Sequence, residues 1–90
     1  MEIKIRMMTA ASKAIAFKKQ NPTSIDEEGF QHISDFIQQS RINDSAIKLA
    51  MIASASKAFD MAHKNPNVPE KQLLRDFVEH IPEVLSSIEG

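Results

Sequence analysis

An internal repeat constrains the fold of this chain more than any other feature of its sequence. Residues 7–22 (MMTAASKAIAFKKQNP) align without a gap to residues 51–66 (MIASASKAFDMAHKNP), at an offset of 44 residues. The identical positions in the first segment are Met7, Ala11, Ser12, Lys13, Ala14, Asn21 and Pro22. Alanine-rich helices can match by chance, but a shared Asn-Pro pair at the same offset indicates a duplication. We therefore predict two copies of one unit, residues 1–43 and 44–90, within a single domain.

Each unit is predicted to be a helical hairpin with an Asn-Pro turn. Proline disfavours the α conformation in the residue before it, so the first helix of each unit should end near Asn21 or Asn65. Ser24 followed by Glu27 matches a capping box, which would start the second helix of the first unit. The apolar periodicity predicts helices at about 4–20, 24–39, 45–63 and 69–88. Pro82 should kink the last helix or end it one turn early.

Small side chains suggest how these helices pack. Alanines at spacings of three or four residues mark one face of the first and third predicted helices, flanked by methionine and phenylalanine. Small residues let two helix axes approach closely, so these helices should cross along their alanine faces. Gly29, on the apolar side of the second helix, predicts another close helix contact. The expected fold is all-α, a four-helix bundle of two tandem hairpins with pseudo-two-fold symmetry.

Composition narrows the class of protein. The chain has no cysteine, which excludes disulfides, thiolate metal sites and cysteine nucleophiles, and favours a cytoplasmic location. No apolar run approaches the roughly 20 residues of a membrane span, and the N-terminal segment lacks the apolar stretch of a signal peptide. We therefore expect no membrane association.

Charge alternates along the chain although the net charge is only −1. Residues 1–20 carry a net +4, residues 21–40 −4, residues 41–64 +2 and residues 65–90 −3. Acidic second helices would repel phosphate, which argues against a helix-turn-helix reader of DNA. The five phenylalanines fit core positions rather than base-stacking platforms. An accessory nucleic-acid-binding protein using Arg6, Lys13 and Lys57 on the first and third helices is the alternative function.

Metal and catalytic sites are not indicated. His32, His63 and His80 lie on three different predicted helices without the spacing of converging zinc ligands. The acidic run at 26–28 lacks the alternating ligands and central glycine of a calcium loop, and helix capping explains it. We expect no enzyme activity, no cofactor and no small-molecule ligand.

The sequence therefore predicts a non-catalytic helical protein–protein interaction or small regulatory module. Dimerisation would add apolar burial to a core of only ninety residues, so a homodimer or another protein partner is expected. Its contact surface would consist of apolar side chains left over after the bundle closes. The candidates are Ile5, Met8, Ile42, Val84, Leu85 and Ile88.

Overall fold

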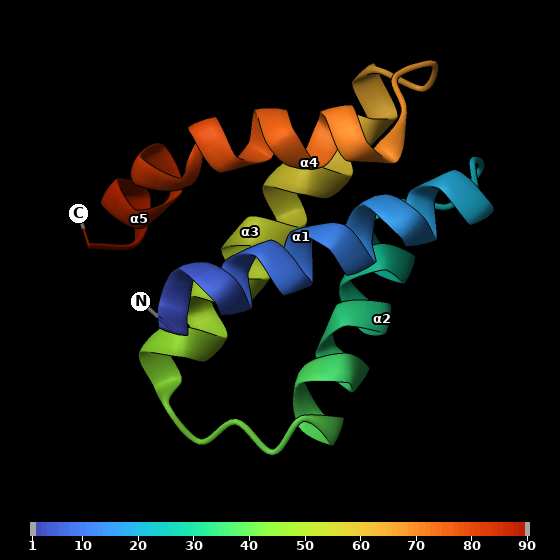
Figure 1. The fold of residues 1–90 in the computed structure, drawn as a ribbon. Helices are drawn as coiled ribbons and strands as arrows, with labels where there is room; N and C mark the ends of the chain where they lie inside the picture. The colour runs from blue at the N-terminus through green and yellow to red at the C-terminus, as the bar shows by residue number, and fades with distance from the viewer. Residues whose placement is uncertain (1, 90) are drawn as a thin grey trace.

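Five α-helices form the fold in the computed structural model, which describes residues 2–89 (Figure 1). They are α1 (Glu2–Gln20), α2 (Asp26–Gln39), α3 (Ser45–Lys64), α4 (Glu70–Glu79) and α5 (Ile81–Glu89). No strand occurs between residues 2 and 89. The all-α prediction is therefore confirmed, and the first three helices lie within about two residues of their predicted positions.

The predicted helix at 69–88 consists of two helices, α4 and α5, which meet at His80; the sequence predicted an interruption at Pro82 but not a fifth helix. Pro82 is the second residue of α5. A proline at that position in a continuous helix would leave the carbonyl of Val78 without its N–H donor and would clash with it. The break places Pro82 in a first turn, where a missing N–H needs no partner. At the end of α4, the His80 N–H donates to the Phe77 carbonyl at 2.8 Å.

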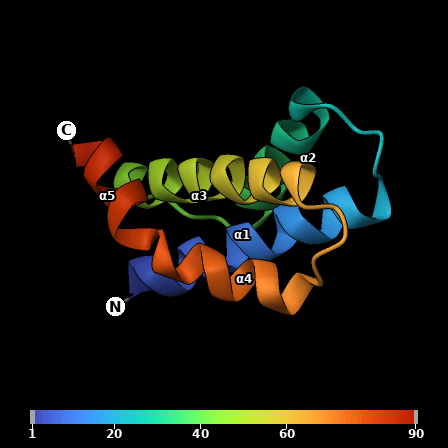
Figure 2. The same ribbon diagram turned by 90° about the horizontal axis from the view of Figure 1, so that it is seen from above.

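The alanine faces of α1 and α3 pack against each other as predicted. These two helices make the most extensive interhelical contact of the fold and run side by side in the same direction (Figures 1 and 2). α4 contacts α1 more extensively than it contacts α3, and α2 contacts α3 more than it contacts α1. The second helix of each hairpin therefore covers the first helix of the other hairpin. The buried alanines at the centre are Ala10, Ala11, Ala14, Ala50, Ala55, Ala58 and Ala62.

The predicted close contact at Gly29 is confirmed. A Cβ atom built on Gly29 would lie 2.6 Å from Cε1 of Phe59, which is closer than real atoms approach. The absence of a side chain thus lets α2 lie directly on the Phe59 ring of α3. The buried face of α2 consists of Gly29, Ile33 and Ile37.

Two predictions for α2 are wrong. Phe30 was expected in the core, but its side chain is 44% exposed because the contact at Gly29 turns the neighbouring position outward. The helix begins one residue later than a Ser24–Glu27 capping box requires. The Glu28 carboxylate accepts from the Ile25 N–H at 2.9 Å, while the Ser24 hydroxyl is buried without a partner. The buried Lys18 ammonium donates to the Ser24 carbonyl at 2.8 Å and so fixes this turn.

The two Asn-Pro turns have matching hydrogen bonds and lie near the same end of the molecule (Figure 2). The Asn21 side-chain amide donates to the Phe17 carbonyl at 3.0 Å, and that of Asn65 donates to the Met61 carbonyl at 2.9 Å. Lys19, at the end of α1, donates to the carbonyl of Pro66 in the other turn at 2.8 Å. The C-terminal end of α1 is therefore bonded to both turns.

Candidate interaction site

A groove of about 550 Å³ crosses the outer face of α3, between α2 and α5. We call it the α3 groove. Its lining residues are Ala14, Asp26, Gly29, Phe30, Ala53, Ala55, Ser56, Lys57, Phe59, Asp60, Glu83, Val84 and Ser87.

Small residues line the α3 groove where α1, α2 and α3 meet. They are Ala14, Ala55 and Gly29. The Phe59 ring packs over Gly29 and completes the floor. Phe30 stands at the rim and offers an apolar surface to solvent. Such a floor admits bulky apolar side chains from outside.

Acidic side chains surround the α3 groove. Asp26, Asp60 and Glu83 line it from three different helices, and Lys57 is the one base among its lining residues. Lys57 Nζ lies 3.8 Å from a Glu83 oxygen and offsets one of the three negative charges. Asp60 pairs with Lys64 at 3.1 Å, but both side chains are more than half exposed. The residues that line the groove therefore carry three negative charges and one positive charge, with Lys64 beside Asp60 at the edge.

A second, shallower groove of about 360 Å³ crosses the outer face of α1 beside α4. We call it the α1 groove. Its lining residues are Ile5, Met8, Thr9, Ser12, Lys13 and Leu74. Thr9, Ser12 and Lys13 precede Ala53, Ser56 and Lys57 of the α3 groove by 44 residues. Leu74 likewise follows Phe30 by 44 residues. Among the side chains that the structure describes, no acidic one lines the α1 groove, whereas three line the α3 groove.

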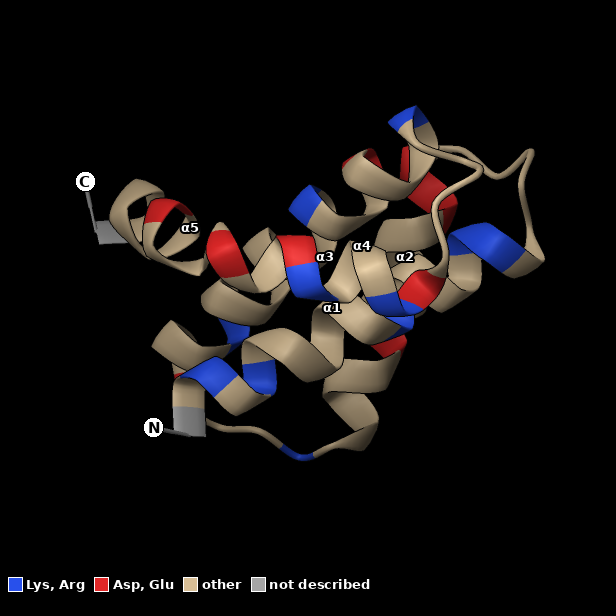
Figure 3. Ribbon diagram, turned by 45° about the horizontal axis from the view of Figure 1, so that its top comes forward, with Lys and Arg blue, Asp and Glu red and all other residues tan. Residues whose placement is uncertain are grey.

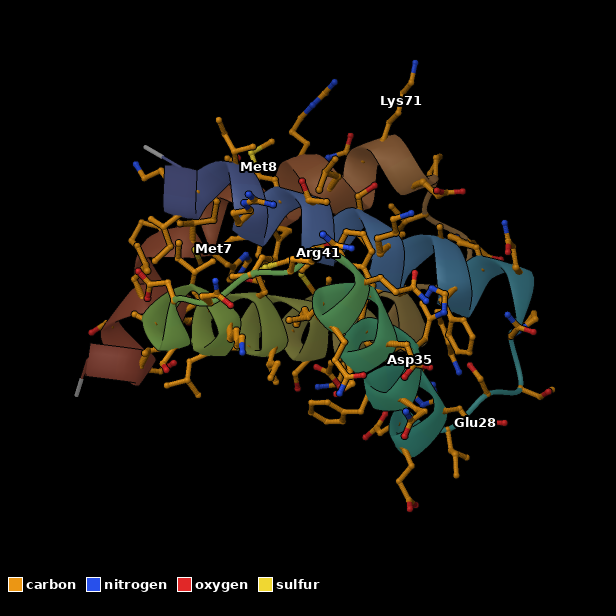
Figure 4. All side chains as sticks on the ribbon, turned by 90° about the horizontal axis from the view of Figure 1, so that it is seen from below. Met7, Met8, Glu28, Asp35, Arg41 and Lys71 are labelled. Atoms are coloured by element: carbon orange, nitrogen blue, oxygen red, sulfur yellow. The ribbon has the colours of Figure 1, made fainter. Side chains whose placement is uncertain are left out.

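The predicted interaction residues divide into three environments. Ile5 and Met8 lie together in the α1 groove, and the Ile5 side chain is 63% exposed. Figure 4 shows Met8 on the outer side of α1, while its neighbour Met7 points into the interior. Ile42 and Val84 are buried in the core. Leu85 and Ile88, on α5, are partly buried against the same core.

Sequence reasoning missed several exposed apolar side chains. Leu49 is 56% exposed and lies on α3, 44 residues after Ile5. The repeat itself could therefore have found it, by transferring the prediction for Ile5 to the equivalent position. Phe30 was missed because the contact of Gly29 with Phe59 decides which face of α2 is buried, and Ile25 was missed because it precedes α2 as its N-cap residue.

The candidate nucleic-acid contacts do not form one patch. Arg6 and Lys13 are exposed on α1, and the Lys13 ammonium lies 5.0 Å from the centre of the Phe36 ring. Lys57 lies on α3, in the groove that carries the acidic side chains. Figure 3 shows basic positions near the N-terminal end of α1 and acidic positions on α5.

The three histidines lie in separate places. His32 stacks on Phe17 with 4.7 Å between ring centres, and His63 is exposed in the last turn of α3. The Nδ1 atom of His80 is 2.9 Å from the carbonyl of Asp76. Among residues 2–89 no three histidine or carboxylate side chains gather in a way that could hold a metal ion. None of the helices described in this part of the chain is long and apolar enough to cross a membrane.

Compared with known proteins, the chain matches no protein-family model, no curated protein and no solved structure.

Proposed function

We propose that this chain is a non-catalytic helical interaction module that associates with itself through its outer grooves. The observation that carries the proposal is the presence of two grooves at positions related by 44 residues, one on α1 and one on α3. Each groove combines small and apolar residues with a helix face that no other part of the described chain covers.

The proposal includes a duplicated architecture, in which two hairpins form a four-helix bundle and α5 is an addition to the second. Burial supports it, because side chains 44 residues apart are buried together. The pairs are Met7 and Met51, Ala10 and Ser54, Ala11 and Ala55, Ala14 and Ala58, Ile15 and Phe59, Ile33 and Phe77, and Ile37 and Ile81. The matching hydrogen bonds of Asn21 and Asn65 point the same way.

Exposed apolar side chains support a role in binding proteins. Ile5 and Leu49 occupy equivalent positions on the outer faces of α1 and α3, and both are more than half exposed. Single exposed apolar residues are ordinary, but clusters beside a groove mark interaction surfaces. Ile5 adjoins Met8 and Leu74, and the face of Leu49 continues into the α3 groove with Phe30 at its rim.

Nucleic-acid binding receives less support from the same geometry. Binding to phosphate needs several cations on one accessible surface. Lys57 belongs to a different helix from Arg6 and Lys13, and it faces Glu83 at 3.8 Å. We therefore retain the interaction module as the proposed function.

The solution mass of the intact chain tests this proposal. We expect light scattering across a dilution series to show a mass above the 10.1 kDa of one chain at high concentration, falling toward that value on dilution. The series should be repeated at low and high salt, because the contribution of charge is screened at high salt. A constant mass of one chain at every concentration would contradict self-association.

A further inference from the structure

We propose that the α3 groove of one copy binds the outer face of α1 from a second copy, so that copies associate head to tail. This inference rests on the proposed self-association and adds its partner surfaces and their polarity. The two surfaces are complementary in charge, and both carry exposed apolar side chains.

The outer face of α1 is a basic amphipathic surface. Ile5 is 63% exposed at its centre, and Met8 lies beside it at the edge of α4. Arg6 and Lys13 are exposed on one side of this centre, and the Lys13 ammonium lies 5.0 Å from the centre of the Phe36 ring of α2. A surface of this kind resembles the helices that dock in grooves, where an apolar residue is inserted and charged residues contact the rim.

The α3 groove offers what this surface requires. Phe30 and Ala53 provide apolar contacts, and Asp26, Asp60 and Glu83 provide negative charge at the sides. Ala53 and Asp60 are seven residues apart on α3, which corresponds to about 10 Å or two helical turns. Ile5 and Ser12 on α1 have the same separation.

Two small residues that α3 contributes to the groove favour a helix as the occupant. Ala53 and Ser56 face outward from α3 without bulky side chains, which lets another helix approach to the short end of the normal 8–10 Å range. On the opposite side of the groove, α5 supplies a wall through Glu83 and Ser87. In the described part of the chain, the α1 groove has no such wall. Arg6 on α1 is exposed, whereas Ala50, at the equivalent position on α3, is buried. α1 is therefore free to enter the groove of another copy.

Charge also decides against pairing of identical surfaces. Two α3 grooves placed face to face would bring acidic side chains together, and two α1 faces would bring basic side chains together. Like charges juxtaposed across an interface cost affinity, whereas opposite charges favour association and fix its orientation. A contact between two different faces is heterologous and extends unless its rotation closes a ring.

A charge-swap experiment on the full chain tests the inference. One variant carries Arg6→Glu and Lys13→Glu, and the other carries Asp60→Lys and Glu83→Lys. Each variant alone places like charges on both proposed surfaces, so its self-association should weaken by about tenfold or more. An equimolar mixture of the two restores opposite charges at every contact and should recover the wild-type mass in light scattering.

A third variant provides the matched control for the two acid-to-lysine changes. Asp35→Lys with Glu79→Lys makes the same change in net charge at exposed positions outside the α3 groove. This control should associate like the wild type, and circular dichroism should show unchanged helicity for all three variants.

The outcomes separate the inference from the proposed function. If the wild type associates but the charge-swap variants associate equally well alone, or their mixture fails to recover the mass, the head-to-tail arrangement is wrong and self-association stands. If the control weakens association as much as Asp60→Lys with Glu83→Lys, net charge rather than the groove is responsible, and the inference again fails. A wild type that remains monomeric overturns both.

Discussion

At the scale of single residues, the position that most determines the shape of the α3 groove is Gly29. The sequence indicated a close contact there because a glycine lies among apolar residues in a helix. It could not indicate the partner, since Phe59 is thirty positions further along the chain and is positioned by α3. The exposure of Phe30 follows from the same contact and could not be predicted from the sequence either.

We expect Gly29→Ala to destabilise the fold by about 1–3 kcal/mol, because the new methyl group overlaps the buried Phe59 ring. This cost exceeds the gain of about 1 kcal/mol that alanine normally brings to a helix interior. Urea unfolding monitored by circular dichroism measures the difference.

The control for Gly29→Ala is the same substitution in a Phe59→Leu background. Leucine lacks the ring atoms that the methyl group would meet, so the penalty should shrink or change sign there. A Gly29→Ala variant that is more stable than the wild type in the Phe59 background would show that the ring yields easily and that the contact does not shape the groove.

At the scale of helices, the elements that repeat were predictable and the elements that differ between the two halves were not. The ends of α1 and α3 follow from the Asn-Pro pairs, which act locally through the restriction that proline imposes on its neighbour. The separation of α4 from α5 depends on Pro82, which the sequence placed correctly as an interruption. The direction of α5 after that interruption depends on Ile81 and Val84 packing into the core, which is a tertiary effect.

The two Asn-Pro turns allow a matched test of the duplicated architecture. Asn21→Ala and Asn65→Ala each remove one side-chain hydrogen bond to the carbonyl four residues earlier. We expect similar losses of about 0.5–1.5 kcal/mol for the two variants, as for a typical hydrogen bond.

The double variant extends this test. The two bonds share no partner, so the losses should add in urea unfolding. A loss at one turn that is several times larger than at the other would contradict equivalent roles for the two turns.

At the scale of the whole molecule, the sequence predicted the class, the central helix pair and one of the exposed apolar residues. Ile5 lies at the surface as a consequence of its place on α1, which periodicity reveals, while Met8 beside it is partly buried. Ile42 is buried because the connection between the two hairpins folds back onto the core, and Val84 is buried because α5 does the same. No local sequence pattern predicts either contact. The α3 groove needed three helices to be placed together before it could be recognised.

The most direct test of the interaction module is sedimentation velocity of Ile5→Ser with Leu49→Ser, compared with the wild type and with Ile25→Ser. All three side chains are more than half exposed, and Ile25 precedes α2 and belongs to neither α1 nor α3, so Ile25→Ser controls for the loss of an exposed apolar residue. We predict that the wild type and Ile25→Ser sediment as associated species at high concentration, while the double variant sediments as a folded monomer. Association of the double variant at wild-type strength would contradict the account, because the outer faces of α1 and α3 would then not be the surfaces that bind.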